Sequence, residues 1–175
     1  FEQLICAIPL LEKLNYSVQL NIFSAIYNKN YKDYYYQLLD LIKSLGLDKK
    51  VNINKDYLPL EDIHKLLSKH DLIVFPYQST TESSSAAVRD GIASLKPVLV
   101  SPLPIFEDVS DLVDYLPGAT PQAIVNGIIE WIDNRENDTK PSLIDKSDRK
   151  ELIEARSFSN LSIRLFSMIR SLEIN

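Results

Sequence analysis

Short apolar strand patterns alternate with amphipathic helix patterns along most of this 175-residue chain. Strands are predicted over residues 18–23, 51–53, 72–75 and 97–100, with a short edge strand over 112–116. Strands that alternate with helices of this length pair in parallel and are joined by right-handed crossovers. The pattern therefore predicts an α/β fold, a Rossmann-like doubly wound parallel sheet, and one domain over residues 1–175.

Helix boundaries are marked by local signals. The spacing of apolar residues predicts helices over 4–14, 31–45 and 84–95, one after Pro59, one from Thr120 and one over 160–172. Gly46 is expected in the left-handed conformation that ends a helix, and Thr120 and Pro121 form an N-cap and first helical residue. Residues 134–150 are polar and predict an exposed connection. The final helix is expected to dock on the sheet.

Composition excludes several classes of function. The net charge of −5 argues against nucleic acid as a partner and against a polybasic grip on anionic membranes. A single cysteine, Cys6, allows neither an internal disulfide nor a multi-cysteine zinc site. The four glycines are too far apart for a Walker loop or a GxGxxG turn. No transmembrane segment is predicted, because a span needs about 20 apolar residues and none of the runs approaches that length.

Ligands of doubly wound sheets bind beyond the carboxyl ends of the strands. The most informative segment of that kind is the hydroxyl-rich loop that follows the strand at 72–75 and leads into a helix of small residues. Ser83, Ser84 and Ser85 stand at the predicted helix start, where hydroxyls and free backbone N–H groups meet the positive end of the helix dipole. Such a start favours a phosphate or pyrophosphate.

Two acids flank this predicted anion site. Glu82 precedes the helix start, and Asp90 follows eight residues later, two helical turns along. A carboxylate accepts hydrogen bonds from two hydroxyl groups, so both acids suit the sugar parts of a nucleotide sugar better than its phosphates. The two histidines indicate no metal centre, and His64 is expected simply at the surface.

At these residues the sequence resembles a known family. Glu82, seven intervening residues, Asp90 and the downstream 96–100 stretch Lys-Pro-Val-Leu-Val are similar to the signature of retaining glycosyltransferase family 4. The segment 69–76, which holds an acid, an apolar strand and a proline, resembles the part that precedes that signature. The likeness extends over about residues 1–133 and implies the carboxyl-terminal, donor-binding half of a GT-B enzyme.

The resemblance implies a role for each matching residue. Glu82 inherits the contact with the transferred sugar, and Asp90 the contact with the ribose hydroxyls. Ser83, Ser84 and Ser85 would hold the sugar and the diphosphate, and Tyr57 and Leu58 would border the nucleobase. Two departures stand out, because Asp90 replaces the usual glutamate and the three serines replace a glycine-aromatic-glycine sequence.

The same resemblance implies what the whole enzyme would do. It would transfer a sugar from a nucleoside diphosphate to a saccharide or glycolipid acceptor, retain the anomeric configuration, and need neither a metal ion nor another cofactor. The chain would be a fragment that lacks the first strand of its domain, a basic pair after that strand and an amino-terminal acceptor domain. Such a fragment is expected to be inactive alone.

Two other functions stay open at this point. A nucleotide-sugar epimerase would use additional acids and histidines that this sequence lacks. A non-catalytic module of a tandem transferase, binding nucleotide sugars or proteins, would share the fold and differ in the upstream basic pair. The lone cysteine and the missing export signal favour the cytoplasm, and a peripheral position at the inner face of the membrane is compatible with both.

Overall fold

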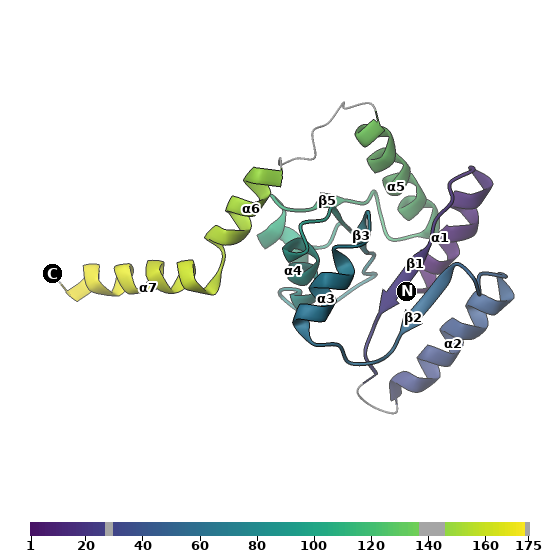
Figure 1. Ribbon diagram of the computed structural model, residues 1–175, viewed down its shortest axis with the longest axis horizontal. Coiled ribbons are helices and arrows are strands. Elements are labelled where there is room, and N and C mark those ends of the chain that lie inside the picture. The colour runs from purple at the N-terminus through teal and green to yellow at the C-terminus, as the bar shows by residue number, and fades with distance from the viewer. Residues whose placement is uncertain (27–29, 137–145, 174–175) are drawn as a thin grey trace.

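The computed structural model describes residues 1–26, 30–136 and 146–173, and Figure 1 shows how the elements are arranged. The strands are β1 (Leu20–Phe23), β2 (Val51–Asn54), β3 (Ile73–Phe75), β4 (Val98–Val100) and β5 (Asp114–Tyr115). The helices are α1 (Glu2–Lys13), α2 (Asn30–Ser44), α3 (Leu60–Leu67), α4 (Ala86–Ala93), the 3-10 helix η1 (Pro104–Val109), α5 (Pro121–Glu136), α6 (Lys146–Ala155) and α7 (Phe158–Glu173).

Every strand pair among the described residues is parallel, which confirms the predicted α/β class. The strands form two sheets, with order β1-β2 in one and β3-β4-β5 in the other. The parallel strands that the sequence predicts are thus divided between two sheets, because β1 and β3 are not hydrogen-bonded to each other. Apolar patterns specify that a segment is a strand, but they do not specify which edge of it finds a partner.

The two faces of the larger sheet are covered by different helices. Alternate residues of β4 point to opposite faces, as strand geometry requires. Val98 and Val100 pack in a buried cluster with residues of α4 and η1, whereas Leu99 packs with residues of α1 and α5. Helices thus cover both faces, as a doubly wound fold requires.

Helix α1 joins the two sheets. Leu4, Ala7 and Leu11 pack in the cluster that contains Leu99 and α5. Ile5 and Ile8, on another side of the same helix, pack with β1, β2 and α2. Because α1 is apolar on two sides, it fixes the position of the β1-β2 sheet relative to the β3-β4-β5 sheet.

Several local predictions are confirmed. Gly46 has a φ of +67° at the end of α2. Thr120 Oγ1 accepts a hydrogen bond from the N–H of Ala123 at 3.3 Å, and α5 begins at Pro121. Helix α4 begins two residues later than predicted, at Ala86, because Ser85 serves as its N-cap.

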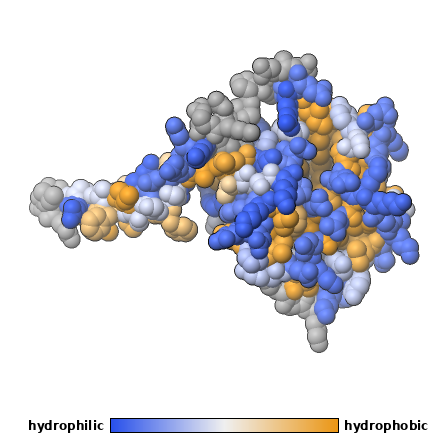
Figure 2. All heavy atoms as spheres, in the orientation of Figure 1, coloured by the Kyte–Doolittle hydropathy of each residue, from blue (hydrophilic) through white to orange (hydrophobic). Residues whose placement is uncertain are grey.

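The carboxyl-terminal predictions need correction. Helix α7 extends away from the rest of the molecule, and Figure 2 shows its apolar atoms open to solvent. Leu161 is 45% exposed and Met168 65% exposed, so the helix does not dock on the sheet. Helical spacing predicts an apolar stripe, but the path of the preceding chain decides what that stripe meets.

The predicted exposed connection over 134–150 overlaps two helices. Residues 134–136 belong to α5, and 146–150 belong to α6, whereas 137–145 lie outside the described residues. Arg156, just beyond α6, pairs with Asp111 at 2.7 Å, which ties this segment to the domain. None of the helices in the described ranges is long and apolar enough to cross a bilayer.

We predict that Gly46→Ala lowers the free energy of unfolding by about 1 kcal/mol, because a Cβ is disfavoured in the left-handed region. A Cβ built at Gly46 meets no atom within 4 Å, so the cost comes from the backbone alone. Urea denaturation of the purified chain measures it. Asn15, at φ +65°, offers the reverse change. Asn15→Gly should leave stability unchanged or raised, and a loss like that of Gly46→Ala would contradict the backbone argument.

Candidate functional site

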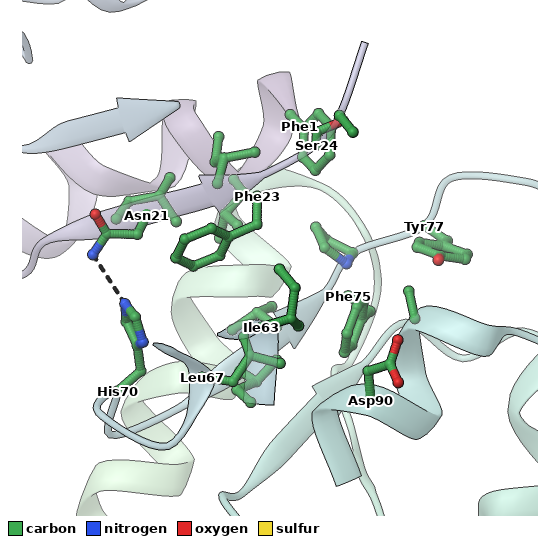
Figure 3. A pocket seen from close by; sticks show the side chains of 18 of the residues that line it. Phe1, Asn21, Phe23, Ser24, Ile63, Leu67, His70, Phe75, Tyr77 and Asp90 are labelled. Carbon is green, nitrogen blue, oxygen red and sulfur yellow. Dashed lines mark hydrogen bonds between the residues drawn. The ribbon is translucent and has the colours of Figure 1, made fainter. Parts of the chain in front are cut away.

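A cleft of about 940 Å³ opens between β1 and β3. Its walls include the residues of both strands and the loops that follow β1, β2 and β3. Phe23, Ile63, Leu67 and Phe75 give it an apolar middle, as Figure 3 shows. This is the region where the sheet is discontinuous.

The two ends of the cleft differ in chemistry. At one end Asn21 Nδ2 lies 3.0 Å from His70 Nε2, the dashed contact of Figure 3. Ser24, Tyr77 and Asp90 lie toward the other end, beyond the carboxyl ends of the strands. In parallel sheets the carboxyl ends of strands lie at one edge, so this second end is the position expected for a ligand.

Four of the seven predicted site residues line this cleft. Glu82 and Asp90 both contribute to its wall, as do Tyr57 and Leu58 from the segment after β2. Tyr57 is 71% exposed, so its ring is open to a ligand. The two acids, predicted from loop and helix spacing, are therefore brought to one cavity.

The three serines do not behave as one group. Ser83 and Ser84 are exposed and are not part of the cleft wall. Ser85 is only 4% exposed, and its Oγ accepts the N–H of Val88 at 3.3 Å as the N-cap of α4. The predicted contact between Ser85 and a donor therefore has no support in this arrangement. Serine is favoured both at anion sites and at N-caps, and its sequence position alone does not distinguish them.

Tyr77 anchors the loop that carries Glu82. Its ring packs edge-on to Phe75 and lies 5.3 Å from the Phe106 ring. Its hydroxyl pairs with Ser85 Oγ at 3.1 Å, and its carbonyl accepts the Ser101 hydroxyl at 2.7 Å. Sequence reasoning missed this role, since an aromatic residue in a polar loop gives no sign that its ring enters the core.

The tip of the same loop is held at two further points. Gln78 Nε2 donates to the carbonyl of Ala119 at 2.8 Å, which links the loop to the segment before α5. The N–H of Glu82 donates to Thr80 Oγ1 at 3.1 Å. These bonds fix the backbone at Glu82 and leave its exposed carboxylate at the cleft wall.

Several acids line the cleft. Within the part of the chain that the structure describes, no Lys or Arg lines it. The acids are Glu2, Asp56, Glu82 and Asp90. Arg89, next to Asp90, is engaged elsewhere: its Nη1 donates to the Ser85 carbonyl at 2.9 Å, and its guanidinium pairs with Asp108 of η1. A bound diphosphate would thus find no side-chain cation in this cleft wall.

Two acids of the cleft have defined partners. Tyr34 donates to Glu2 Oε2 at 2.8 Å, and burial together with this carboxylate raises the pKa of Tyr34. Asp90 Oδ1 lies 3.3 Å from Nε2 of His64, on the neighbouring helix α3. The described ranges contain no group of three or more His, Cys, Asp or Glu side chains arranged to hold a metal ion.

The model of the family described as Glycosyl transferases group 1 matches residues 1–148. The chain belongs to this family. A search of the curated proteins found no sequence that matches. The group 1 assignment thus rests on the family model, and the GT-B fold that the sequence implied is confirmed by solved structures.

Three solved structures illustrate how this group 1 domain is related to others. Sucrose-phosphate synthase from Thermosynechococcus elongatus superposes with a TM-score of 0.72 and 13% identity over 99% of this chain and 43% of that chain. HepE from Anabaena, in complex with UDP and glucose, superposes with a TM-score of 0.70 and 17% identity. The match covers 97% of this chain and 43% of the HepE chain. The C-terminal domain of the group 1 protein LpcC from Francisella tularensis superposes with a TM-score of 0.64 and 16% identity. The match covers 89% of this chain and 77% of the LpcC domain.

The coverage values show how much of each matched chain the group 1 domain spans. It spans 43% of the sucrose-phosphate synthase and HepE chains. It spans 77% of the isolated LpcC domain. At these identities the likeness describes the fold.

We predict that Ser85→Ala lowers the free energy of unfolding by about 1 kcal/mol, the usual cost of losing a helix N-cap. The change also removes the partner of the Tyr77 hydroxyl. Urea denaturation measures the free energy of unfolding of the chain and its variants. The control is Ser84→Ala, at the exposed neighbour, which should change this free energy by no more than about 0.5 kcal/mol. Equal losses in the two variants would show that the cap does not stabilise α4.

Proposed function

We propose that this domain binds the nucleoside diphosphate sugar donor of a retaining glycosyltransferase. The observation that carries the proposal is that Glu82 and Asp90 line one cleft, at the carboxyl ends of the strands, in a chain of the group 1 family. HepE, similar in fold, was crystallised with UDP and glucose. Both parts of such a ligand carry hydroxyl groups, which carboxylates bind well.

The proposed pose follows the order of the lining residues. Glu82, on the loop after β3, would contact the hydroxyls of the transferred sugar. Asp90, two helical turns along α4, would contact the ribose, and the exposed ring of Tyr57 would border the base. The first turn of α4 would face the diphosphate with its backbone N–H groups and the positive end of its dipole.

Catalysis in this proposal consists of stabilising the leaving diphosphate. Negative charge develops on the diphosphate as the bond to the sugar breaks, and fixed N–H groups and cations meet it without reorganisation. Because acids and neither Lys nor Arg contribute side chains to the described cleft wall, the cations would come from elsewhere in the polypeptide. We propose that the transfer is metal-independent and that these cations are carried by residues outside this chain.

We also propose that a further strand lies between β1 and β3 in the natural polypeptide. Three observations support it: the edges of both strands face the cleft, Leu72 and Val74 of an apolar segment are only half-buried, and Phe1, next to α1, lines the cleft. A parallel strand at this position would lead into α1 and then β1 as a right-handed crossover. An amino-terminal acceptor domain would precede that strand.

The added strand has a direct test. Amides of β1 and β3 that face the cleft should exchange with solvent in the isolated chain and become protected when the natural upstream segment is included, because each then donates to the new strand. Hydrogen exchange followed by NMR measures this. Amides of β4, which is paired on both sides, serve as the internal control. Unchanged exchange in β1 and β3 would refute the added strand.

Donor binding is tested by titrating UDP, GDP and their sugar conjugates into the natural full-length polypeptide. We expect one nucleotide series to bind and Glu82→Ala to lower turnover at least tenfold, about 1.4 kcal/mol of transition-state stabilisation. Glu82→Gln, which keeps the shape and loses the charge, separates the two contributions. Glu151→Ala removes an equal charge from α6, and turnover should not change.

The outcomes divide the possible functions. Full activity in Glu82→Ala would remove Glu82 from the site. Binding of nucleotide sugars without turnover by the wild-type full-length polypeptide would indicate a non-catalytic module. Absence of binding to either nucleotide series would reject the donor-site proposal.

A further inference from the structure

His64 and Asp90 meet across two packed helices. His64 lies on α3 and Asp90 on α4, and His64 Nε2 is 3.3 Å from Asp90 Oδ1. The side chains are 33% and 36% exposed, so the pair is partly shielded from water. The two helices pack on the same side of the β3-β4-β5 sheet (Figure 1).

Only one member of the pair lines the cleft. Asp90 contributes to the cleft wall, whereas His64 does not, although its neighbour Ile63 does. Figure 3 shows the Asp90 carboxylate at the top of α4, on the side of the cleft. The imidazole therefore supports the carboxylate from α3 and leaves the second oxygen, Oδ2, for a group that enters the cleft.

An aspartate in this position gains from such support. An unrestrained surface carboxylate samples several rotamers, and ordering it on binding costs affinity. A hydrogen bond to a ring carried by a packed helix reduces that cost before the ligand arrives. Within the described residues His64 is the side-chain partner that the structure gives to Asp90.

We infer that His64 is a positioning residue for Asp90, holding its carboxylate in the orientation that receives the ribose hydroxyls of the donor. The inference rests on the proposed function and deepens it, because it assigns a residue that touches no ligand to the recognition of ribose. It predicts that His64 affects binding only when the ligand carries the ribose hydroxyls.

The experiment compares UDP and GDP with their 2′,3′-dideoxy counterparts by calorimetry on the natural full-length polypeptide. The variants are His64→Ala, His64→Gln, Asp90→Ala and the double variant His64→Ala/Asp90→Ala. Lys65→Ala is the matched control, since Lys65 is the exposed neighbour of His64 on α3. The nucleotide that binds more tightly to the wild type is the reference ligand.

We expect Asp90→Ala to weaken the ribonucleotide about tenfold or more, as loss of a charge-assisted hydrogen bond would. His64→Ala should weaken it about three- to tenfold, the effect of one ordinary hydrogen bond, and should leave the dideoxy nucleotide within about twofold. His64→Gln, whose amide can donate to Asp90, should restore most of the loss. The double variant should bind no more weakly than Asp90→Ala.

Other results would show which of two proposals is wrong: the ribose contact of Asp90 or the positioning role of His64. If Asp90→Ala does not change ribonucleotide affinity, or neither nucleotide binds, the proposed ribose role of Asp90 fails, and the role of His64 fails with it. If Asp90→Ala weakens binding and His64→Ala does not, only the positioning role is wrong. Equal losses for the ribose and dideoxy ligands in His64→Ala would also overturn it, because they would indicate a general effect on folding.

Discussion

The two-sided packing of α1 is the constraint on which the rest of the molecule depends. Leu4, Ala7 and Leu11 pack toward α5 and β4, while Ile5 and Ile8 pack toward β1, β2 and α2. Burial of a single such side chain contributes about 1.5–3 kcal/mol, so the helix holds the two sheets through several strong contacts. Where α1 lies determines how far β1 stands from β3, and hence the width of the cleft.

The loop after β3 depends on this frame in a second way. Tyr77 is half-buried and Ser85 is buried, and the hydrogen bond between their hydroxyls connects the loop and α4 to the core. They fix the positions of Glu82 and Asp90, which do line the cleft. In this domain, therefore, residues that stabilise the fold also set the orientation of the site.

Local features of the site could be predicted from the sequence, and tertiary ones could not. Glu82 and Asp90 share one loop and one short helix, so their spacing alone places them near one another. The pairing of His64 with Asp90 arises from the packing of α3 on α4, 26 residues apart along the chain, and the sequence suggested only a surface histidine. The sequence predicts a ligand contact for Ser85, which is the N-cap of α4, because an N-cap and an anion site favour the same residue.

The fold shows the same division. Strand direction and helix starts follow from residue patterns, and Gly46, Thr120 and Pro121 lie as predicted. Sheet continuity and the docking of α7 depend on neighbours that a pattern does not name. An amphipathic pattern indicates that a helix has an apolar face, and the path of the chain determines what packs against that face.

The open edges of β1 and β3 have a further consequence for the behaviour of the domain in solution. A row of backbone donors and acceptors without partners accepts any extended chain, including one from another copy of the same molecule. Concentrated solutions of the domain alone are thus expected to form edge-to-edge oligomers. A strand in the cleft, as proposed above, would protect against this self-association.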